Sequence, residues 1–214
     1  MASGQLRVVH LAREHAALDI LLDGEPRLAA LRYGQASAYL TLPVGAHTLA
    51  ARPTGEEPSV PSTAIAVELS AGACWTIVLP PAAAAPLVLA DESFAPMGGP
   101  PQVRLVHAAD GAPAVDLAVS DGPTLVQSLA FATASPYVDA PAGTRGVIVR
   151  PAGGGDLLAS IPDATLVPDT AYTMIVARAT ADAASLTLLP LVDGYPPLRF
   201  PARTPPRPAG AVGR

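Results

Sequence analysis

The chain contains one internal repeat, and this repeat limits its fold more than any other feature. Residues 6–19 align with residues 103–116 without a gap, and six of these fourteen positions are identical, a histidine and an aspartate among them. The alignment then continues at an offset one residue larger, where Tyr39 matches Tyr137. A period of roughly 100 residues is the size of a small domain, whereas solenoid repeats span about 20–50 residues. The sequence therefore predicts two tandem domains of the same fold.

The domain boundaries that we expect follow this repeat. The first domain is placed at residues 5–95 and the second at residues 102–198. Residues 96–101 contain glycine and proline pairs, which are typical of a linker. Residues 199–214 are rich in proline and arginine, so we expect them to be extended rather than folded.

Each domain is expected to be an all-β sandwich. The 214 residues include 25 prolines and 18 glycines, a composition that disfavours helices and favours short strands joined by turns. Apolar and polar residues alternate with the period of a strand near the start of each domain, and Asp23 with Gly24 supplies a hairpin turn. The predicted fold class is therefore all-β, with two tandem Ig-like or transthyretin-like antiparallel β-sandwich domains.

Near the end of each domain, residues 69–78 match residues 167–176 at the larger offset, which equates Cys74 with Tyr172. Cys74 is the only cysteine, so neither an intrachain disulfide nor a cysteine-based zinc site is expected. The thiol lies in an apolar run, which indicates a buried and inert side chain.

Charge and hydropathy exclude several classes of partner. The formal net charge is −5, and all 18 carboxylates lie at or before Asp193. A body this acidic repels phosphate backbones, so we expect no nucleic-acid partner. The longest apolar stretch is interrupted by prolines and is too short to cross a membrane. Residues 1–5 lack the charged and apolar segments of a signal peptide.

Residues 103–116 read V-R-L-V-H-A-A-D-G-A-P-A-V-D and resemble the opening motif of the DUF4397 family, R-V-V-H-A-S-P-D-A-P-A-V-D-V. The family's F-G-x-x-S-x-Y stretch and its P-A-G turn are similar to residues 131–137 and 141–143. The first domain departs from the opening motif but keeps the family glycine as Gly34, where the second domain has Ala132. The resemblance implies a bacterial or archaeal β-sandwich, often in tandem in exported or surface proteins, and it implies no activity.

A histidine and an aspartate recur in both domains, as His10 with Asp19 and as His107 with Asp116. Strand alternation places each histidine inside its sandwich and each aspartate on an outer face. We therefore predict structural roles for both pairs. The histidine donates to a loop carbonyl, and the aspartate accepts hydrogen bonds from backbone N–H groups of the preceding turn.

Two arginines and two tyrosines recur as well. Alternation places Arg7 and Arg104 on the faces opposite the histidines, and we expect both guanidinium groups to face solvent. Tyr39 and Tyr137 are expected to be core aromatic residues and, with the histidines and aspartates, to be part of the structural motif.

No pattern indicates a catalytic centre, a metal or a cofactor. Ser37 and Ser135 recur, but neither lies in a G-x-S-x-G nucleophile elbow. The four histidines do not have the spacing of a zinc site, and no glycine-rich loop is followed by lysine, which is absent from the chain. We expect no metal and no cofactor.

The leading hypothesis is a non-catalytic structural or protein-interaction module with an unknown protein or surface partner. Self-association through sheet edges is a subsidiary expectation. Two alternatives stay open. One is a carbohydrate or cell-wall binding module in which Tyr195 and Phe200 form an exposed face. The other is a hydrolase that uses His107 and Asp116 with a neighbouring serine.

Overall fold

The protein is described by a computed structural model that covers residues 2–56, 63–81, 84–91, 99–181 and 184–194. Within these residues all regular structure is β-strand, which confirms the all-β fold class. The expected tail at residues 199–214 and residues 96–98 of the expected linker at residues 96–101 lie outside the described residues.

The strands form two sandwich-like halves. The first half contains β1 (Ser3–His10), β2 (Ala17–Leu22), β3 (Glu25–Arg32), β4 (Leu40–Pro43), β5 (Gly45–Pro53), β6 (Thr63–Leu69), β7 (Cys74–Leu79) and β8 (Leu87–Asp91). The second half contains β9 (Gln102–His107), β10 (Val115–Val119), β11 (Thr124–Leu129), β12 (Thr133–Ala134), β13 (Val138–Asp139), β14 (Gly143–Pro151), β15 (Ala159–Leu166), β16 (Ala171–Arg178) and β17 (Leu186–Asp193).

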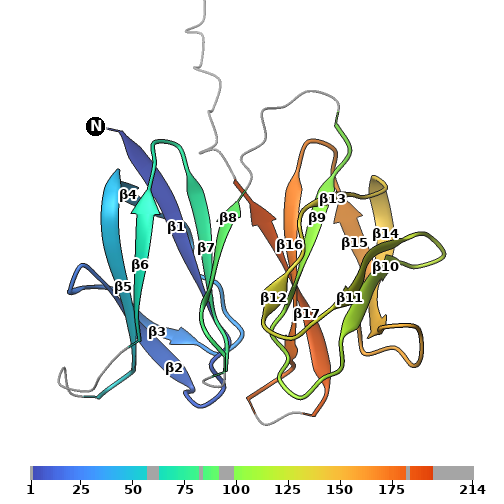
Figure 1. Ribbon diagram of the computed structural model, residues 1–214, viewed down its shortest axis with the longest axis horizontal. Coiled ribbons are helices and arrows are strands. Elements are labelled where there is room, and N and C mark those ends of the chain that lie inside the picture. Colours follow the sequence, from blue (N-terminus) through green and yellow to red (C-terminus); the bar gives the residue numbers. More distant parts are fainter. Residues whose placement is uncertain (1, 57–62, 82–83, 92–98, 182–183, 195–214) are drawn as a thin grey trace, which may run out of the picture.

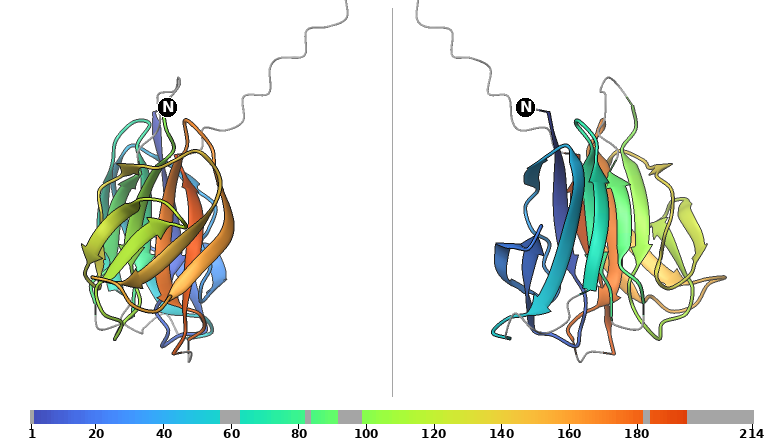
Figure 2. Two further views of the ribbon diagram at one scale, coloured as in Figure 1. Left: turned by 90° about the vertical axis from the view of Figure 1, so that its right-hand side faces the viewer. Right: turned by 60° about the vertical axis from the view of Figure 1, so that its left-hand side comes forward.

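Four sheets are stacked face to face as four layers (Figure 1). In the first half, the outer sheet has the order β3-β2-β5-β6 and the inner sheet the order β4-β1-β7-β8. In the second half, the inner sheet has the order β12-β9-β16-β17, with β13 also paired to β9, and the outer sheet the order β11-β10-β14-β15. Seen along the stack, the second half covers most of the first (Figure 2).

Each half has its own apolar core between its inner and outer sheets. In β2, the burial alternates with the period of a strand, because one face covers the core and the other faces solvent. The first core includes Leu6, Val8, Ile20, Leu49 and Ile77, and the second includes Val103, Leu105, Leu117, Val149 and Met174.

One pairing in each half is parallel, whereas the sequence analysis expected antiparallel sheets throughout. β1 runs parallel to β7, and β9 runs parallel to β16. These strands lie at the centre of the inner sheets, where both faces are covered by protein. Such strands are near-continuous apolar runs rather than strictly alternating ones, and β16 is buried at seven consecutive residues.

The register of the parallel pairs corrects one predicted equivalence. Leu6 pairs with Trp75, and its repeat counterpart Val103 pairs with Tyr172. Trp75 is therefore the counterpart of Tyr172, and the expected match with Cys74 is wrong by one residue. A shift of one residue along a strand exchanges its two faces, so the correction decides which side chains meet between the halves.

A third apolar cluster joins the two halves. It lies between the inner sheets and uses the faces that point away from both cores. Its buried members are Val9, Leu11 and Val78 from the first half and Val106, Ala108, Ile175 and Ala177 from the second. Each inner sheet therefore covers the core of its own half with one face and contacts the other half with its opposite face.

Candidate functional site

His10 ends β1 and is fully buried. Its Nε2 lies 3.0 Å from the carbonyl oxygen of His15, and its Nδ1 accepts a hydrogen bond from the amide of Ala12 at 3.2 Å. Burial lowers the pKa of His10 to about 4, so the neutral ring is the form present at pH 7. The Tyr33 ring meets it edge-on, with centroids 6.0 Å apart. The imidazole thus holds the loop that follows β1.

His107 makes the same contacts in the second half. Its Nε2 lies 2.9 Å from the carbonyl oxygen of Pro113, and its Nδ1 accepts from the amide of Ala109 at 3.3 Å. Phe131 takes the place of the tyrosine, with ring centroids 5.9 Å apart. Burial lowers the pKa of His107 as well.

Asp19 lies on the outer face of β2 and accepts hydrogen bonds from the amide of Ala30 and the hydroxyl of Thr54, each at 2.9 Å. These bonds, the amide first, lower the pKa of the Asp19 carboxyl. Ala30 has a φ of 52°, at a register irregularity between β2 and β3. The carboxylate therefore binds the amide of a residue held in a left-handed conformation, on the neighbouring strand rather than in the preceding turn.

Asp116 has the same role in the second half. It accepts from the amide of Ser128 at 2.7 Å and from that of Gly153 at 3.3 Å, and Ser128 has a φ of 51°. His107 is buried and bound to its own loop. The two side chains proposed for a hydrolase are thus engaged separately, on different faces of the sandwich.

The repeated serines bind the backbone around them. The hydroxyl of Ser37 accepts from the amide of Val8 at 3.0 Å and donates to the carbonyl of Ala38 at 2.8 Å. Ser135 accepts from the amide of Leu105 at 2.9 Å and donates to the carbonyl of the next residue. Each serine thereby fastens the segment before β4 or β13 to the first strand of its half.

Arg7 is 4% exposed, which overturns the expectation that it faces solvent. It does lie on the face opposite His10, but the second half covers that face. Its Nε donates to Thr76 at 2.8 Å, and its two terminal nitrogens donate to the carbonyl of Val192 and to the carboxylate of Asp193. A residue of β1 thus forms a buried ion pair with the end of β17.

Arg104 is also 4% exposed and repeats the arrangement in the opposite direction. Its Nε donates to Thr173 at 2.7 Å, and its terminal nitrogens donate to the carbonyl of Ala90 at 2.8 Å and to the carboxylate of Asp91. Each half therefore gives one arginine to the other half and receives one in return. The expectation of an exposed Arg104 is wrong for the same reason as for Arg7.

Tyr39 belongs to this boundary rather than to the core of its half. The guanidinium of Arg7 lies over its ring, 4.8 Å from the centroid, and its hydroxyl donates to Asp91 at 2.7 Å. Tyr137 lies under Arg104 in the same way, at 4.7 Å. Each tyrosine thus stacks on the arginine of its own half and binds the carboxylate that receives the other arginine.

Burial and charge act in opposite directions on the pKa of the Asp193 carboxyl. Burial raises the pKa of Asp193, and the Arg7 guanidinium and the Thr173 hydroxyl counteract that rise. Burial also raises the pKa of Tyr39 and of Tyr137 far above the ordinary value, so both hydroxyls keep their protons and act as donors.

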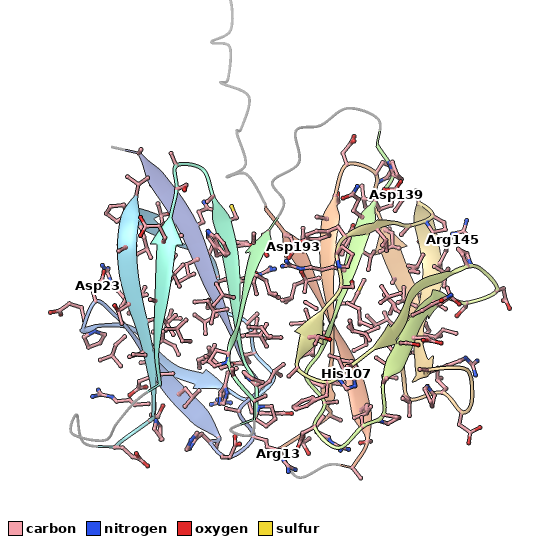
Figure 3. The ribbon with its side chains drawn as sticks, viewed as in Figure 1. Arg13, Asp23, His107, Asp139, Arg145 and Asp193 are labelled. Atoms are coloured by element: carbon pink, nitrogen blue, oxygen red, sulfur yellow. The ribbon has the colours of Figure 1, made fainter. Side chains whose placement is uncertain are left out.

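We call this set of side chains the reciprocal network. Its members are Arg7, Tyr39, Thr76 and Asp91 from the first half and Arg104, Tyr137, Thr173 and Asp193 from the second. Asp193 lies at the boundary between the halves (Figure 3). The sequence analysis missed four members, although two arginines repeated inside apolar runs were a signal that these charges are buried.

A second polar cluster at the boundary is not reciprocal. Arg13 and Asp110 form an ion pair at 2.9 Å, and Arg178 donates to the carbonyl oxygen of Asp110. The Tyr33 hydroxyl donates to the carbonyl of Arg178 at 3.1 Å, and its counterpart Phe131 has no hydroxyl. This cluster distinguishes the first half from the second.

Apart from these two sets, His47 and Asp23 form a further titratable pair in the described part of the chain. His47 lies 2.7 Å from Asp23 and 2.9 Å from the carbonyl oxygen of Pro43, and the bond between the two side chains raises the pKa of His47 and lowers that of Asp23. Burial raises the pKa of the free Cys74 thiol. Among the described residues, no group of three or more histidine, cysteine or acidic side chains could hold a metal ion.

Two further expectations concern the surface. Tyr195 and Phe200, the aromatic pair of the carbohydrate-binding alternative, lie outside the described residues. In the described ranges, no helix has the length and hydropathy needed to span a membrane.

Comparisons with known proteins identify a family and likenesses to solved structures. A family model described as a domain of unknown function, DUF4397, matches residues 4–118, more than half of the chain. No curated protein matches the sequence. The fold is similar to the crystal structure of CBMbc, of family CBM26, from Eubacterium rectale Amy13K in complex with maltoheptaose. That match covers 91% of this chain and 98% of the other, at 9% identity and with a TM-score of 0.28.

Proposed function

The chain belongs to the DUF4397 family, a domain of unknown function. We propose that it is a non-catalytic structural and protein-interaction module built from two copies of the family unit. The family model covers a single stretch, residues 4–118. The second copy is therefore part of the proposal.

The reciprocal network is the observation that carries the proposal. Its arginines, threonines and tyrosines occupy matching positions in the two halves and make matching contacts. Two units of the same architecture can form such an arrangement, because the arginine of each unit donates to the aspartate of the other. The network and the apolar cluster beside it fix the orientation of the halves, so that the outer sheets face away from each other.

The internal use of the recurring polar groups supports a module without catalysis. A general base and a nucleophile need to lie within hydrogen-bond reach of each other. His107, Asp116 and Ser135 are instead each bonded to a different segment of backbone. In this proposal, the polar groups that recur in the sequence maintain the fold, and the outer surfaces contact the partner.

The test compares the intact chain with His107→Gln and Asp116→Asn on chromogenic esters, peptides and glycosides. We expect no turnover above buffer for any of the three proteins. We also expect His107→Gln to lower the midpoint of thermal unfolding, because a buried ring that ties down a loop is lost.

Turnover by the wild-type chain that either substitution abolishes, with an unchanged near-ultraviolet circular dichroism spectrum, would overturn the proposal in favour of the hydrolase. Ser160→Ala serves as the control variant, because Ser160 is an exposed serine of β15.

A further inference from the structure

The sheets leave several edge strands, and most of these are protected against pairing with another chain. Unpaired strand edges are sites of association unless they are short, bulged or interrupted by proline. β4, β8, β12 and β13 have at most five residues each. β3 and β11 have irregular register, and β15 and β17 contain Pro162 and Pro190.

β6 is the exception among the described edge strands. It has seven residues, contains no proline and pairs with β5 in unbroken register from Ala51–Thr63 to Gly45–Leu69. Its only charged residue is Glu68. No other described strand pairs with its outer edge.

The register identifies the backbone groups that this edge presents. Thr48 bonds to Asp23 at the end of β2, because its carbonyl accepts from the Asp23 amide. Backbone groups of successive residues point to opposite sides of a strand, so His47 and Leu49 bond to β6. Their partners in β6 are odd-numbered. The N–H and C=O groups of the even-numbered residues therefore point outward; these residues are Ala64, Ala66 and Glu68.

We propose that this edge pairs with the same edge of a second copy of the chain. The two β6 strands run antiparallel about a two-fold axis at Ala66, and the two outer sheets become one continuous sheet. Ala66 of one copy exchanges both backbone bonds with Ala66 of the other, and Ala64 does so with Glu68. This pairing satisfies every outward backbone group of the three residues. It is independent of the proposed function.

The side chains of β6 fit this pairing. On the exposed face, Glu68 of one copy lies opposite Ala64 of the other, so no like charges meet. On the core face, Ile65 lies opposite Val67 of the second copy, and pairs of β-branched residues are favourable across strands. The sequence of the strand is thus complementary to itself in this one register.

The second half lacks this edge although it has the same architecture. Its corresponding strand, β15, has a register shift that opposes Pro162 and Asp163 to the segment between Arg145 and Val147 of β14. The corresponding segment of β6 is a single residue, Ala66, opposite Thr48. The protected edge and the open edge therefore differ at the residue on the proposed axis.

Sedimentation velocity on the full chain, from low micromolar to millimolar concentration, tests the pairing. We expect a monomer–dimer equilibrium for the wild type and a monomer throughout for Ala66→Pro. Proline removes the outward N–H but no bond to β5, and it is tolerated where the N–H of an edge strand faces solvent. Ala66→Ser keeps the N–H and is expected to dimerise like the wild type.

Two substitutions test the register. Ala64→Arg places an arginine opposite Glu68 of the second copy at two symmetric sites, and we expect it to tighten the dimer about fivefold. Ala64→Glu places two carboxylates opposite each other and is expected to weaken it by a similar factor.

A wild-type chain that stays monomeric over the whole concentration range would overturn the proposal and leave the edge to a strand of another protein. A dimer that Ala66→Pro leaves intact would also overturn it. Equal dissociation constants for Ala64→Arg and Ala64→Glu would refute the register centred on Ala66. Thermal unfolding of each variant shows whether the monomer is folded.

Discussion

The buried His10 ring is neutral in the folded chain, and this makes the stability of the fold depend on pH. Its Nδ1 accepts an amide hydrogen bond, which a protonated imidazole could not do. The folded chain thus resists protonation of His10 until about pH 4, while the unfolded chain takes up the proton near pH 6.5.

We predict that the contribution of His10 to the free energy of unfolding is fully present above about pH 6.5 and is lost as the pH falls toward 4. The sign follows because the unfolded state binds the proton first. Urea unfolding of the wild type and of His10→Gln measures the effect, and the difference between them should shrink by on the order of 2 kcal/mol between about pH 7.5 and about pH 4.5. A difference that does not change with pH would contradict the prediction.

For individual residues, the sequence predicted which face of a strand a side chain occupies, but not what packs against that face. Alternation places His10 inside and Asp19 outside, and the structure has them there. Alternation also placed Arg7 on the face away from the core, which is its position. It could not reveal that another sheet covers that face, because the cover comes from the other half: Arg7 contacts Asp193, which lies 186 residues further along the chain.

At the scale of strands and turns, the turn after β3 provides a comparison between the halves. Gly34 has a φ of 78°, and its counterpart Ala132 has a φ of 58°. A Cβ at Gly34 would meet nothing within 4 Å, so backbone conformation alone distinguishes the two residues there. A left-handed conformation costs an L-residue about 1–2 kcal/mol relative to glycine.

We predict that Ala132→Gly stabilises the protein and that Gly34→Ala destabilises it, each by about 0.5–1 kcal/mol. The added flexibility of glycine in the unfolded chain offsets part of the strain. Chemical denaturation of the two variants measures both changes. Ala134→Gly is the control, because Ala134 lies in β12 and has no positive φ, so this change should destabilise. A loss of stability in Ala132→Gly would refute the explanation.

Strand existence was predictable from the sequence, whereas strand pairing was not. Alternation and the Asp23-Gly24 turn indicated strands at the start of the first domain, where β1 and β2 lie, and antiparallel pairing was expected throughout. β1 instead pairs in parallel with β7. Predicting this pairing requires the register between distant segments. The repeat alignment could not supply it, because it was wrong by one residue at Trp75 and Tyr172.

For the whole molecule, the reciprocal network has the geometry of a two-fold interface within one chain. A buried ion pair need not add stability over apolar residues, but removing one partner leaves a charge uncompensated and costs about 3–5 kcal/mol. The carboxylates could not be identified as a pair from the sequence, because Asp91 and Asp193 are 102 residues apart and fall outside the aligned segments.

We predict that Asp193→Asn lowers the free energy of unfolding by about 3 kcal/mol, because Arg7 then stays buried without a counter-charge. Asp163→Asn, on an exposed position of β15, is the matched control and should change it by less than about 0.5 kcal/mol. Replacing both partners, as Arg7→Met with Asp193→Leu, should recover most of the loss. Urea unfolding measures all three variants, and an Asp193→Asn variant as stable as the control would refute the prediction.

The bond between Arg7 and Asp193 joins the middle of β1 to the last residue of β17, which are the first and last of the described strands. During synthesis, the arginine emerges long before its carboxylate exists. A nascent chain that stops short of β17 therefore contains Arg7 but lacks the carboxylate of Asp193 that compensates its charge. The buried charge of Arg7 is therefore compensated only once β17 is complete.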